Sequence, residues 1–239
     1  MAWIKKGSKT DYLDIVKKVA RPYLFLRHDL DYDLDHALRF AEYEASNGIS
    51  STYFLLPTAP YFDYSFDFKI KVRALEQMGH ELGLHNNFYY SYLIEKWDLQ
   101  TLSDEVNRPL DFLRDIWCDV ELTSCHGQRE HYDAGVFNYQ IWREFDIKKN
   151  EGFPDIKPIL SLKDFGLKEV YFEYYTHYWS DSGNGWTGIV VDGQKPFERS
   201  ARNSPENIGH DVIEAFNESK IQHASLQILT HPCHYEEIK

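Results

Sequence analysis

The chain has 239 residues, of which 43% are hydrophobic and 16% aromatic, so it can bury a large core, and we predict one domain spanning 1–239. Its 26 Lys and Arg against 38 Asp and Glu give a net charge of −12, which argues against nucleic acid or an anionic membrane as a partner. No apolar run is long enough to span a bilayer. The N-terminus lacks the pattern of a signal peptide, and the three cysteines have no metal-type spacing, so we expect a reduced, cytoplasmic protein.

The first predicted strand is the apolar run Leu24-Phe25-Leu26, which leads into two acids, Asp29 and Asp31. A helical period follows over 34–45 and stops at Asn47-Gly48. Carboxylates two residues apart repel each other unless a cation or a shared proton lies between them. In α/β folds, the carboxyl ends of strands are where ligands collect. The spacing therefore predicts a metal ligand beside a general base.

Further strands and helices alternate along the rest of the chain. The predicted strands are 51–56, 81–84, 120–124, 167–179 and 226–230, and the predicted helices are 67–78, 98–117 with a kink at Pro109, 134–145 and 207–218. The segment 181–206 is the best candidate for a long loop. This alternation predicts an α/β fold with a parallel sheet.

Polar side chains follow six of these strands, and the strand ends of a closed barrel meet at one mouth. These residues are Asp29 with Asp31, Thr58, His85, His126, Asp181 and His231. Because a metal site needs such convergence, we favour a (β/α) barrel over an open sheet. Asp31 and His85 form part of a ligand set for zinc or a similar divalent ion.

Four segments in order resemble the polysaccharide deacetylases with a NodB-homology domain. They are Arg27-His28-Asp29-Leu30-Asp31, Gly48-Ile49-Ser50-Ser51-Thr52-Tyr53-Phe54, Gly79-His80-Glu81-Leu82-Gly83-Leu84-His85 and Leu229-Thr230-His231-Pro232. The resemblance covers roughly residues 22–235 and is closer to a divergent branch associated with surface-polysaccharide and O-antigen loci. It implies a distorted, seven-stranded barrel of the TIM type.

The resemblance also implies a role for each matched residue. Asp29 corresponds to the general base, Asp31 and His85 to metal ligands, and His231 to the general acid that protonates the leaving amine. A divalent metal, zinc in the first place, would polarise the amide carbonyl and hold the attacking water. A carboxylate and an imidazole suit the two proton transfers.

One position departs from the family pattern, because Tyr89 stands where the family has its second metal histidine. The third ligand can come from His126, from water, or from nothing, and the last case would impair catalysis. Three residues are candidates for substrate binding: Tyr89, Asp181 and Trp186. Asp181 can orient a catalytic histidine or bind a sugar hydroxyl, and Trp186 can stack on a sugar ring.

The sequence leaves three hypotheses. The first is a metal-dependent hydrolase that removes an N-acyl group, acetyl in the first place, from a sugar or sugar precursor for surface glycan synthesis. The second is a barrel metal-hydrolase that acts on another C–N or ester bond. The third is a catalytically impaired protein of the same fold that binds carbohydrate through its aromatic rim.

Overall fold

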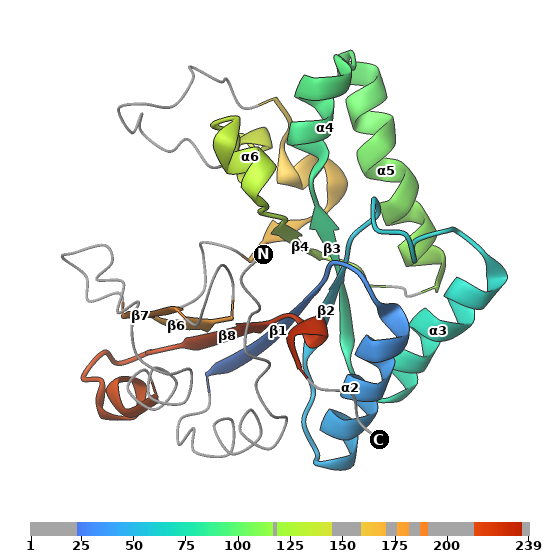
Figure 1. Ribbon diagram of the computed structural model, residues 1–239. Coiled ribbons are helices and arrows are strands. Elements are labelled where there is room, and N and C mark those ends of the chain that lie inside the picture. Colours follow the sequence, from blue (N-terminus) through green and yellow to red (C-terminus); the bar gives the residue numbers. More distant parts are fainter. Residues whose placement is uncertain are drawn as a thin grey trace. The chain divides into compact units, whose positions relative to one another are not determined.

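The computed structural model describes residues 23–116, 119–144, 159–170, 176–181, 187–190 and 213–235 (Figure 1). The chain divides into two compact units. The first unit comprises Met1–Tyr53, Met78–His80 and Phe172–Lys239, and the second comprises Phe54–Gln77 and Glu81–Tyr171. Each unit is described by itself below.

The first unit contains the strands β1 (Leu24–Leu30), β8 (Leu226–Thr230), β6 (His177–Ser180) and β7 (Thr187–Val190), side by side in that order (Figure 1). β8 pairs in parallel with both β1 and β6, and β7 pairs antiparallel with β6. In the β1–β8 register, Arg27 lies opposite Leu229 and His28 opposite Thr230. This register brings the Asp-x-Asp segment and His231 to the same end of two neighbouring strands.

The helix α2 (Leu34–Ser46) follows β1 directly. Its N-cap is Asp33, whose side chain accepts a hydrogen bond from the backbone N–H of His36 at 2.9 Å. The first unit also contains a helix at 213–218 and the short 3-10 helix η3 (Pro232–His234). Its core joins side chains from β1, α2, β6, β8 and these helices: Leu26, Phe40, Trp179, Ile213, Phe216, Ala224, Leu226, Ile228 and Tyr235.

The second unit contains the parallel strands β3 (Glu81–Asn86), β4 (Leu122–Cys125) and the two-residue β5 (Lys168–Glu169). The chain passes from the first unit to the second within β2 (Thr52–Leu55). In β3, a Cβ at position 83 would lie 2.3 Å from the Phe54 ring, so this close approach requires Gly83.

Helices and 3-10 turns complete the second unit: α3 (Phe66–Gln77), α4 (Phe88–Glu95), α5 (Leu99–Ile116), α6 (Arg129–Asp133), η1 (Asn138–Ile141) and η2 (Leu162–Phe165). α5 continues through Pro109 and buries Leu102, Val106, Leu110 and Leu113 on one face, as its periodicity predicts. Phe68 of α3 stacks on Phe112 of α5, with ring centroids 5.8 Å apart.

The predicted α/β class is confirmed, because seven of the strands in the described part of the chain are parallel and alternate with helices. Three sequence predictions were wrong. The long loop expected at 181–206 contains the strand β7 (Thr187–Val190). The helix expected at 134–145 is replaced by α6 and η1, since Gly135 adopts a φ of 67° just after α6 ends. The strand expected at 167–179 is two strands with different partners, because β5 pairs with β4 and β6 with β8.

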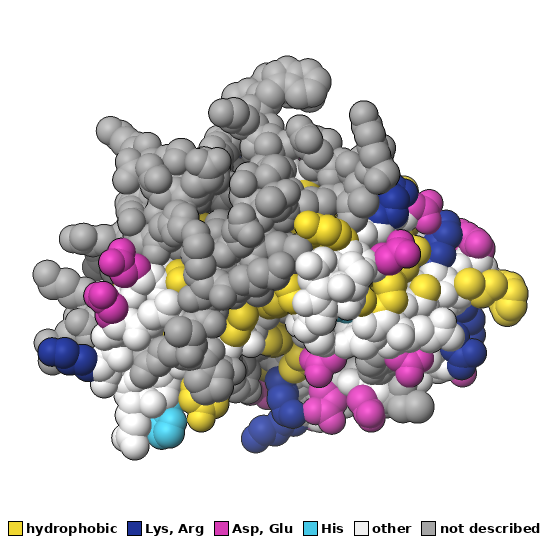
Figure 2. Space-filling view, turned by 90° about the horizontal axis from the view of Figure 1, so that it is seen from below, with side chains coloured by type: hydrophobic (Ala, Val, Ile, Leu, Met, Phe, Trp, Pro, Cys, Tyr) yellow, Lys and Arg dark blue, Asp and Glu magenta, His cyan; other side chains and the backbone are white. Residues whose placement is uncertain are grey.

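Basic and acidic side chains are interspersed on the described surface in Figure 2. Exposed ion pairs also occur among the described residues: Lys69 bonds to Asp115 at 2.5 Å and Lys168 to Glu121 at 2.7 Å. Exposed pairs of this kind contribute little to stability. Among the described residues, no helix has the length and apolar character needed to cross a membrane.

Candidate active site

Asp29 lies inside β1 and is bound by the arginine two residues before it. Arg27 donates from Nε to Asp29 Oδ1 at 2.8 Å and from Nη2 to Oδ2 at 2.6 Å. Their side chains are 1% and 4% exposed, so this two-pronged ion pair is buried. Strand alternation puts residues i and i+2 on one face, which is the reason the two side chains meet.

Asp31 follows β1, and one of its carboxylate oxygens lies 3.8 Å from Nε2 of His231. His231 follows β8 directly. The first unit therefore brings together three of the predicted residues, Asp29, Asp31 and His231, as the β1–β8 register requires.

Asp181 holds His231 from the opposite side of its ring. One carboxylate oxygen accepts from His231 Nδ1 at 2.6 Å, and the other accepts from the backbone N–H of His231 at 2.8 Å. Burial alone would raise the pKa of Asp181, but the positive charge and hydrogen bond of His231 outweigh it and lower that pKa to about 2. Burial alone would lower the pKa of His231, but the charges of Asp181, Asp31 and Asp29 raise it to about 9. Nδ1 is thus tied to Asp181 while a protonated Nε2 faces Asp31.

His234 is a second imidazole on the same carboxylate. Its Nδ1 lies 3.1 Å from Asp181 Oδ2, and its ring centroid lies 4.9 Å from that of His231. Ligand atoms of Asp181, His231 and His234 lie within 4.8 Å of one another. Direct hydrogen bonds join the carboxylate of Asp181 to both imidazoles.

His28 faces away from Asp29 and belongs to a buried network around Glu44 of α2, which is fully buried. Glu44 lies 2.9 Å from His28 Nε2 and accepts from the hydroxyls of Ser51 at 2.7 Å and Tyr53 at 2.8 Å. His28 Nδ1 lies 2.6 Å from the hydroxyl of Thr230. The network therefore ties β1 to both α2 and β8 next to Asp29 and His231.

In the second unit, His85 lies within β3 and His126 follows β4. His85 Nδ1 lies 2.8 Å from the carbonyl oxygen of Ser124, which can only accept, so Nδ1 carries a proton. A histidine oriented in this way by its other nitrogen is the usual form of a metal ligand. The ring of His126 lies edge-on to that of His85, with centroids 5.0 Å apart.

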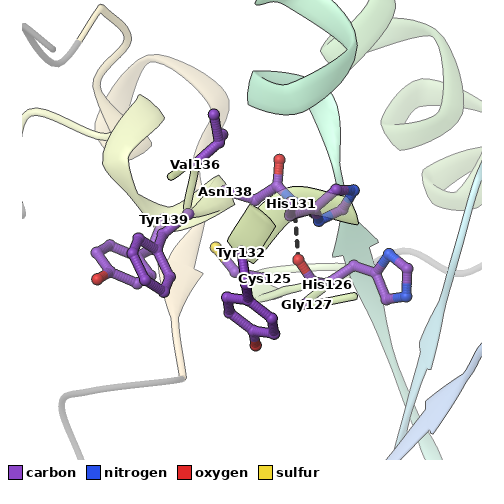
Figure 3. A pocket seen from close by; sticks show the side chains of 9 residues that line it. Cys125, His126, Gly127, His131, Tyr132, Val136, Asn138 and Tyr139 are labelled. Carbon is purple, nitrogen blue, oxygen red and sulfur yellow. Dashed lines mark hydrogen bonds between the residues drawn. The ribbon is translucent and has the colours of Figure 1, made fainter. Parts of the chain in front are cut away.

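His131 of α6 packs against His126, with ring centroids 5.5 Å apart and planes at 89°. Burial lowers the pKa of His131. Both residues line a cavity together with Cys125, Tyr132, Val136 and Tyr139 (Figure 3). Asn138 closes one side and donates from Nδ2 to the carbonyl oxygen of His126 at 2.7 Å, the contact dashed in Figure 3.

Tyr89, in the first turn of α4, is fully buried, and its hydroxyl has no hydrogen-bond partner among the described residues. Burial, with a smaller effect from Tyr92, raises its pKa to about 12, so the hydroxyl stays protonated at physiological pH. A buried phenol is a poor metal ligand in this form, although it can donate a hydrogen bond.

The predicted site residues thus fall in both units. Asp29, Asp31, Asp181 and His231 lie in the first, and His85, Tyr89 and His126 lie in the second. Trp186 lies outside the described residues. Sequence reasoning missed Glu44, His131, Asn138 and His234. The only sequence signal for any of them is the recurrence of histidine in His231-Pro232-Cys233-His234.

No family model matches the chain, and no curated protein matches it. Several solved structures are similar to the chain, and three of them are described here. A family 4 carbohydrate esterase from Bacillus anthracis is 14% identical over 52% of this chain and 64% of its own, less than two thirds, with a TM-score of 0.34. A mutant of peptidoglycan deacetylase PdaC from Bacillus subtilis is 9% identical over 90% of both chains, with a TM-score of 0.41. A Streptococcus mutans CE4 esterase is 14% identical over 95% of this chain and 79% of its own, with a TM-score of 0.45.

Proposed function

We propose that this chain is a metal-dependent hydrolase that removes an N-acyl group, acetyl in the first place, from a sugar or sugar precursor used in surface-polysaccharide biosynthesis. The observation that carries this proposal is the Asp181–His231–Asp31 arrangement in the first unit. It presents a protonated imidazole nitrogen 3.8 Å from a carboxylate that the sequence motif marks as a metal ligand.

His231 is suited to the role of general acid. Asp181 fixes the ring, and the charges of Asp181, Asp31 and Asp29 raise the pKa of His231 to about 9, so Nε2 carries a proton at neutral pH. An acid that stays protonated can give that proton to an amine as the C–N bond breaks. After the transfer, the negative charge of Asp181 favours recapture of a proton from water, which resets the site.

Asp29 is the proposed general base, and Arg27 is its positioning residue. Each carboxylate oxygen accepts one hydrogen bond from Arg27. The buried guanidinium holds the carboxylate in one orientation and stabilises its charged form. It therefore fixes the geometry of the base.

Asp31, His85 and His126 are the proposed metal ligands. In support, His85 Nδ1 donates to a carbonyl oxygen, as in a ligating histidine, and a carboxylate with two imidazoles is a common zinc set. When bound, zinc would supply Lewis-acid activation of the acyl carbonyl and of water. Tyr89, Asp181 and Trp186 remain the proposed substrate-binding residues. Asp181 would have to bind substrate while it keeps its hydrogen bonds to His231 and His234.

Metal content tests the ligand assignment. We expect about one equivalent of zinc in the purified protein after loosely bound ions are removed, measured by plasma mass spectrometry. Asp31→Ala, His85→Ala and His126→Ala should each lose it. His223→Ala, which removes an exposed histidine of the first unit, is the matched control and should keep it. A wild type that stays metal-free after reloading with zinc would refute the metal-dependent mechanism.

Acetate release from N-acetylglucosamine oligomers tests the reaction itself. Asp29→Asn should keep the metal and lose at least about 100-fold in kcat, because general-base catalysis typically contributes 10²–10⁴-fold. His231→Gln should slow release of the free amine to a similar extent. If Asp29→Asn releases acetate at the wild-type rate, Asp29 is not the base.

A second candidate function is carbohydrate binding without turnover. Two observations favour this alternative. Arg27 forms two hydrogen bonds to Asp29, and Tyr89 occupies the position of the family's second metal histidine. Saturable binding of the same oligomers by metal-loaded protein, with no acetate released, would establish this alternative.

A further inference from the structure

The turn after β8 places two histidines beside one buried carboxylate in the first unit. η3 begins at Pro232, and the backbone N–H of His234 donates to the carbonyl oxygen of His231 at 2.9 Å. Because side chains three residues apart eclipse each other in a 3-10 helix, both imidazoles lie on one side of the turn. Their ring centroids are 4.9 Å apart. The pairing of β6 with β8 brings Asp181 to the same side.

The two histidines turn the same ring nitrogen toward this carboxylate. His231 Nδ1 lies 2.6 Å from Asp181 Oδ1, and His234 Nδ1 lies 3.1 Å from Oδ2. Ligand atoms of all three side chains lie within 4.8 Å of one another. A tetrahedral zinc ion with bonds of about 2.0–2.2 Å separates its ligand atoms by about 3.3–3.5 Å. To hold zinc, the cluster therefore has to lengthen its shortest distance by about 0.7 Å.

The surroundings of the three side chains also suit a metal ion. The backbone N–H of His231 donates to Asp181 Oδ2 at 2.8 Å, and a hydrogen bond of this kind orients a ligating carboxylate. The side chain of Asp181 is 4% exposed and that of His234 is 25% exposed, so an ion can enter from solvent past His234. Solvent can then supply the fourth ligand. One carboxylate and two imidazoles are oxygen and nitrogen ligands that bind zinc.

We propose that Asp181, His231 and His234 form a second zinc site, separate from the one proposed around Asp31, and that zinc bound there prevents proton transfer by His231. Zinc on His231 Nδ1 replaces the proton that this nitrogen donates to Asp181, and that proton leaves to solvent. The ring is then a neutral imidazole, whose remaining Nε2–H is a much weaker acid than an imidazolium. The site stands without the proposed function, whereas the inhibition rests on it, because it takes His231 as the general acid.

Zinc content at rising free zinc tests the site without any turnover. Chelator-treated protein would be dialysed against increasing zinc, and the bound ion counted by plasma mass spectrometry. Because zinc has to replace two hydrogen bonds to Asp181, we expect this site to fill after the first equivalent. The wild type should reach about two equivalents and His234→Ala about one. His223→Ala, at an exposed position of the first unit, is the control and should match the wild type. Equal zinc in wild type and His234→Ala would overturn the site.

The same titration in a His85→Ala background separates this site from the proposed catalytic metal. His85→Ala removes a ligand of the catalytic metal only, so it should still bind about one equivalent at high zinc, and the His85→Ala/His234→Ala double variant should bind none. Equal zinc in these two variants would contradict the site. Equal zinc in wild type and His85→Ala, with the loss confined to His234→Ala, would support the site and refute the proposed catalytic ligands instead.

Acetate release from N-acetylglucosamine oligomers at limiting and at excess zinc tests the inhibition. Filling the second site should lower kcat of the wild type by about 100-fold or more, the size of a general acid's contribution. His234→Ala should show the same rate at both zinc levels, and His223→Ala should be inhibited like the wild type. A wild-type rate that stays constant while the second equivalent binds would refute the inhibition. Absence of acetate release at every zinc level would instead refute the proposed hydrolysis, and the zinc counts would still decide the site.

Discussion

Tyr89 carries a buried hydroxyl with no hydrogen-bond partner among the described residues, at the position where the family pattern has a metal histidine. Its ring is well packed and lies nearly parallel to that of Tyr92, with centroids 6.2 Å apart. The ring can therefore be explained by packing, whereas the hydroxyl cannot. A buried hydroxyl without a hydrogen bond lowers stability, so the Tyr89 hydroxyl is a candidate for contact with substrate.

Tyr89→Phe separates these two contributions. Because the variant removes an unsatisfied buried hydroxyl and keeps the ring, we expect the free energy of unfolding to rise by about 1 kcal/mol in urea denaturation. If the hydroxyl contacts substrate, KM for N-acetylglucosamine oligomers should rise at the same time. Tyr92→Phe, at a partly exposed neighbour, should change neither quantity. A more stable Tyr89→Phe with unaltered KM would remove Tyr89 from the substrate-binding residues.

Individual residues differ in how far the sequence could predict them. The Arg27–Asp29 contact follows from strand alternation, which puts both side chains on one face. The contact of Asp181 with His231 joins residues 50 positions apart, and only the pairing of β6 with β8 brings them together. Asn138 has no local pattern, since its amide contacts Tyr90 of α4, His126 after β4 and His131 of α6, which lie 48, 12 and 7 positions away.

At the scale of elements, the Glu44 network fixes α2 against β1. Three side chains hydrogen-bond to this one carboxylate: His28 from β1, Tyr53 from β2 and Ser51 just before β2. A buried carboxylate of this kind is stable only when its polar partners are hydrogen-bonded to it. Removing the carboxylate leaves those partners buried without a hydrogen bond. Helical periodicity alone does not predict this network, because Glu44 has the pattern of an ordinary charged residue in an amphipathic helix.

Glu44→Ala should therefore lower the free energy of unfolding by about 3–5 kcal/mol, the range for breaking a buried charged network. Urea denaturation followed by circular dichroism measures this change. Glu42→Ala, two residues earlier and exposed on the same helix, should stay within about 0.5 kcal/mol of wild type. A loss below about 1 kcal/mol for Glu44→Ala would mean that the network contributes little to the packing of α2.

The sequence predicted elements best where one periodicity ran without interruption. β8 and α5 match their predicted ranges to within a residue or two because apolar residues recur at the strand or helix period. The prediction was wrong at 134–145, where Gly135 at positive φ separates α6 from η1. It also missed α4, whose first turn, at Phe88 and Tyr89, is aromatic and buried and lacks a polar, amphipathic pattern.

At the scale of the whole molecule, the Asp181–His231 pair should shape how stability depends on pH. His231 has a pKa raised from 6.5 to about 9, so its stabilising contribution is complete below pH 6.5 and is lost as the pH rises through 9. Asp181 has a pKa lowered from 3.8 to about 2, so its contribution is present above pH 3.8 and is lost as the pH falls through 2. Both contributions are therefore complete only between pH 3.8 and 6.5.

The free energy of unfolding of metal-free protein, measured by urea denaturation in the presence of a chelator, tests this expectation. Between pH 6.5 and 9 the wild type should lose on the order of 3 kcal/mol relative to Asp181→Asn, because the neutral amide no longer holds the proton on His231. Asp111→Asn, at an exposed position of α5, should follow the wild-type curve. Parallel curves for wild type and Asp181→Asn across this range would show that His231 is not held in its charged form. The general acid would then have to be sought elsewhere, with His234, the other imidazole bound to Asp181, as the first residue to test.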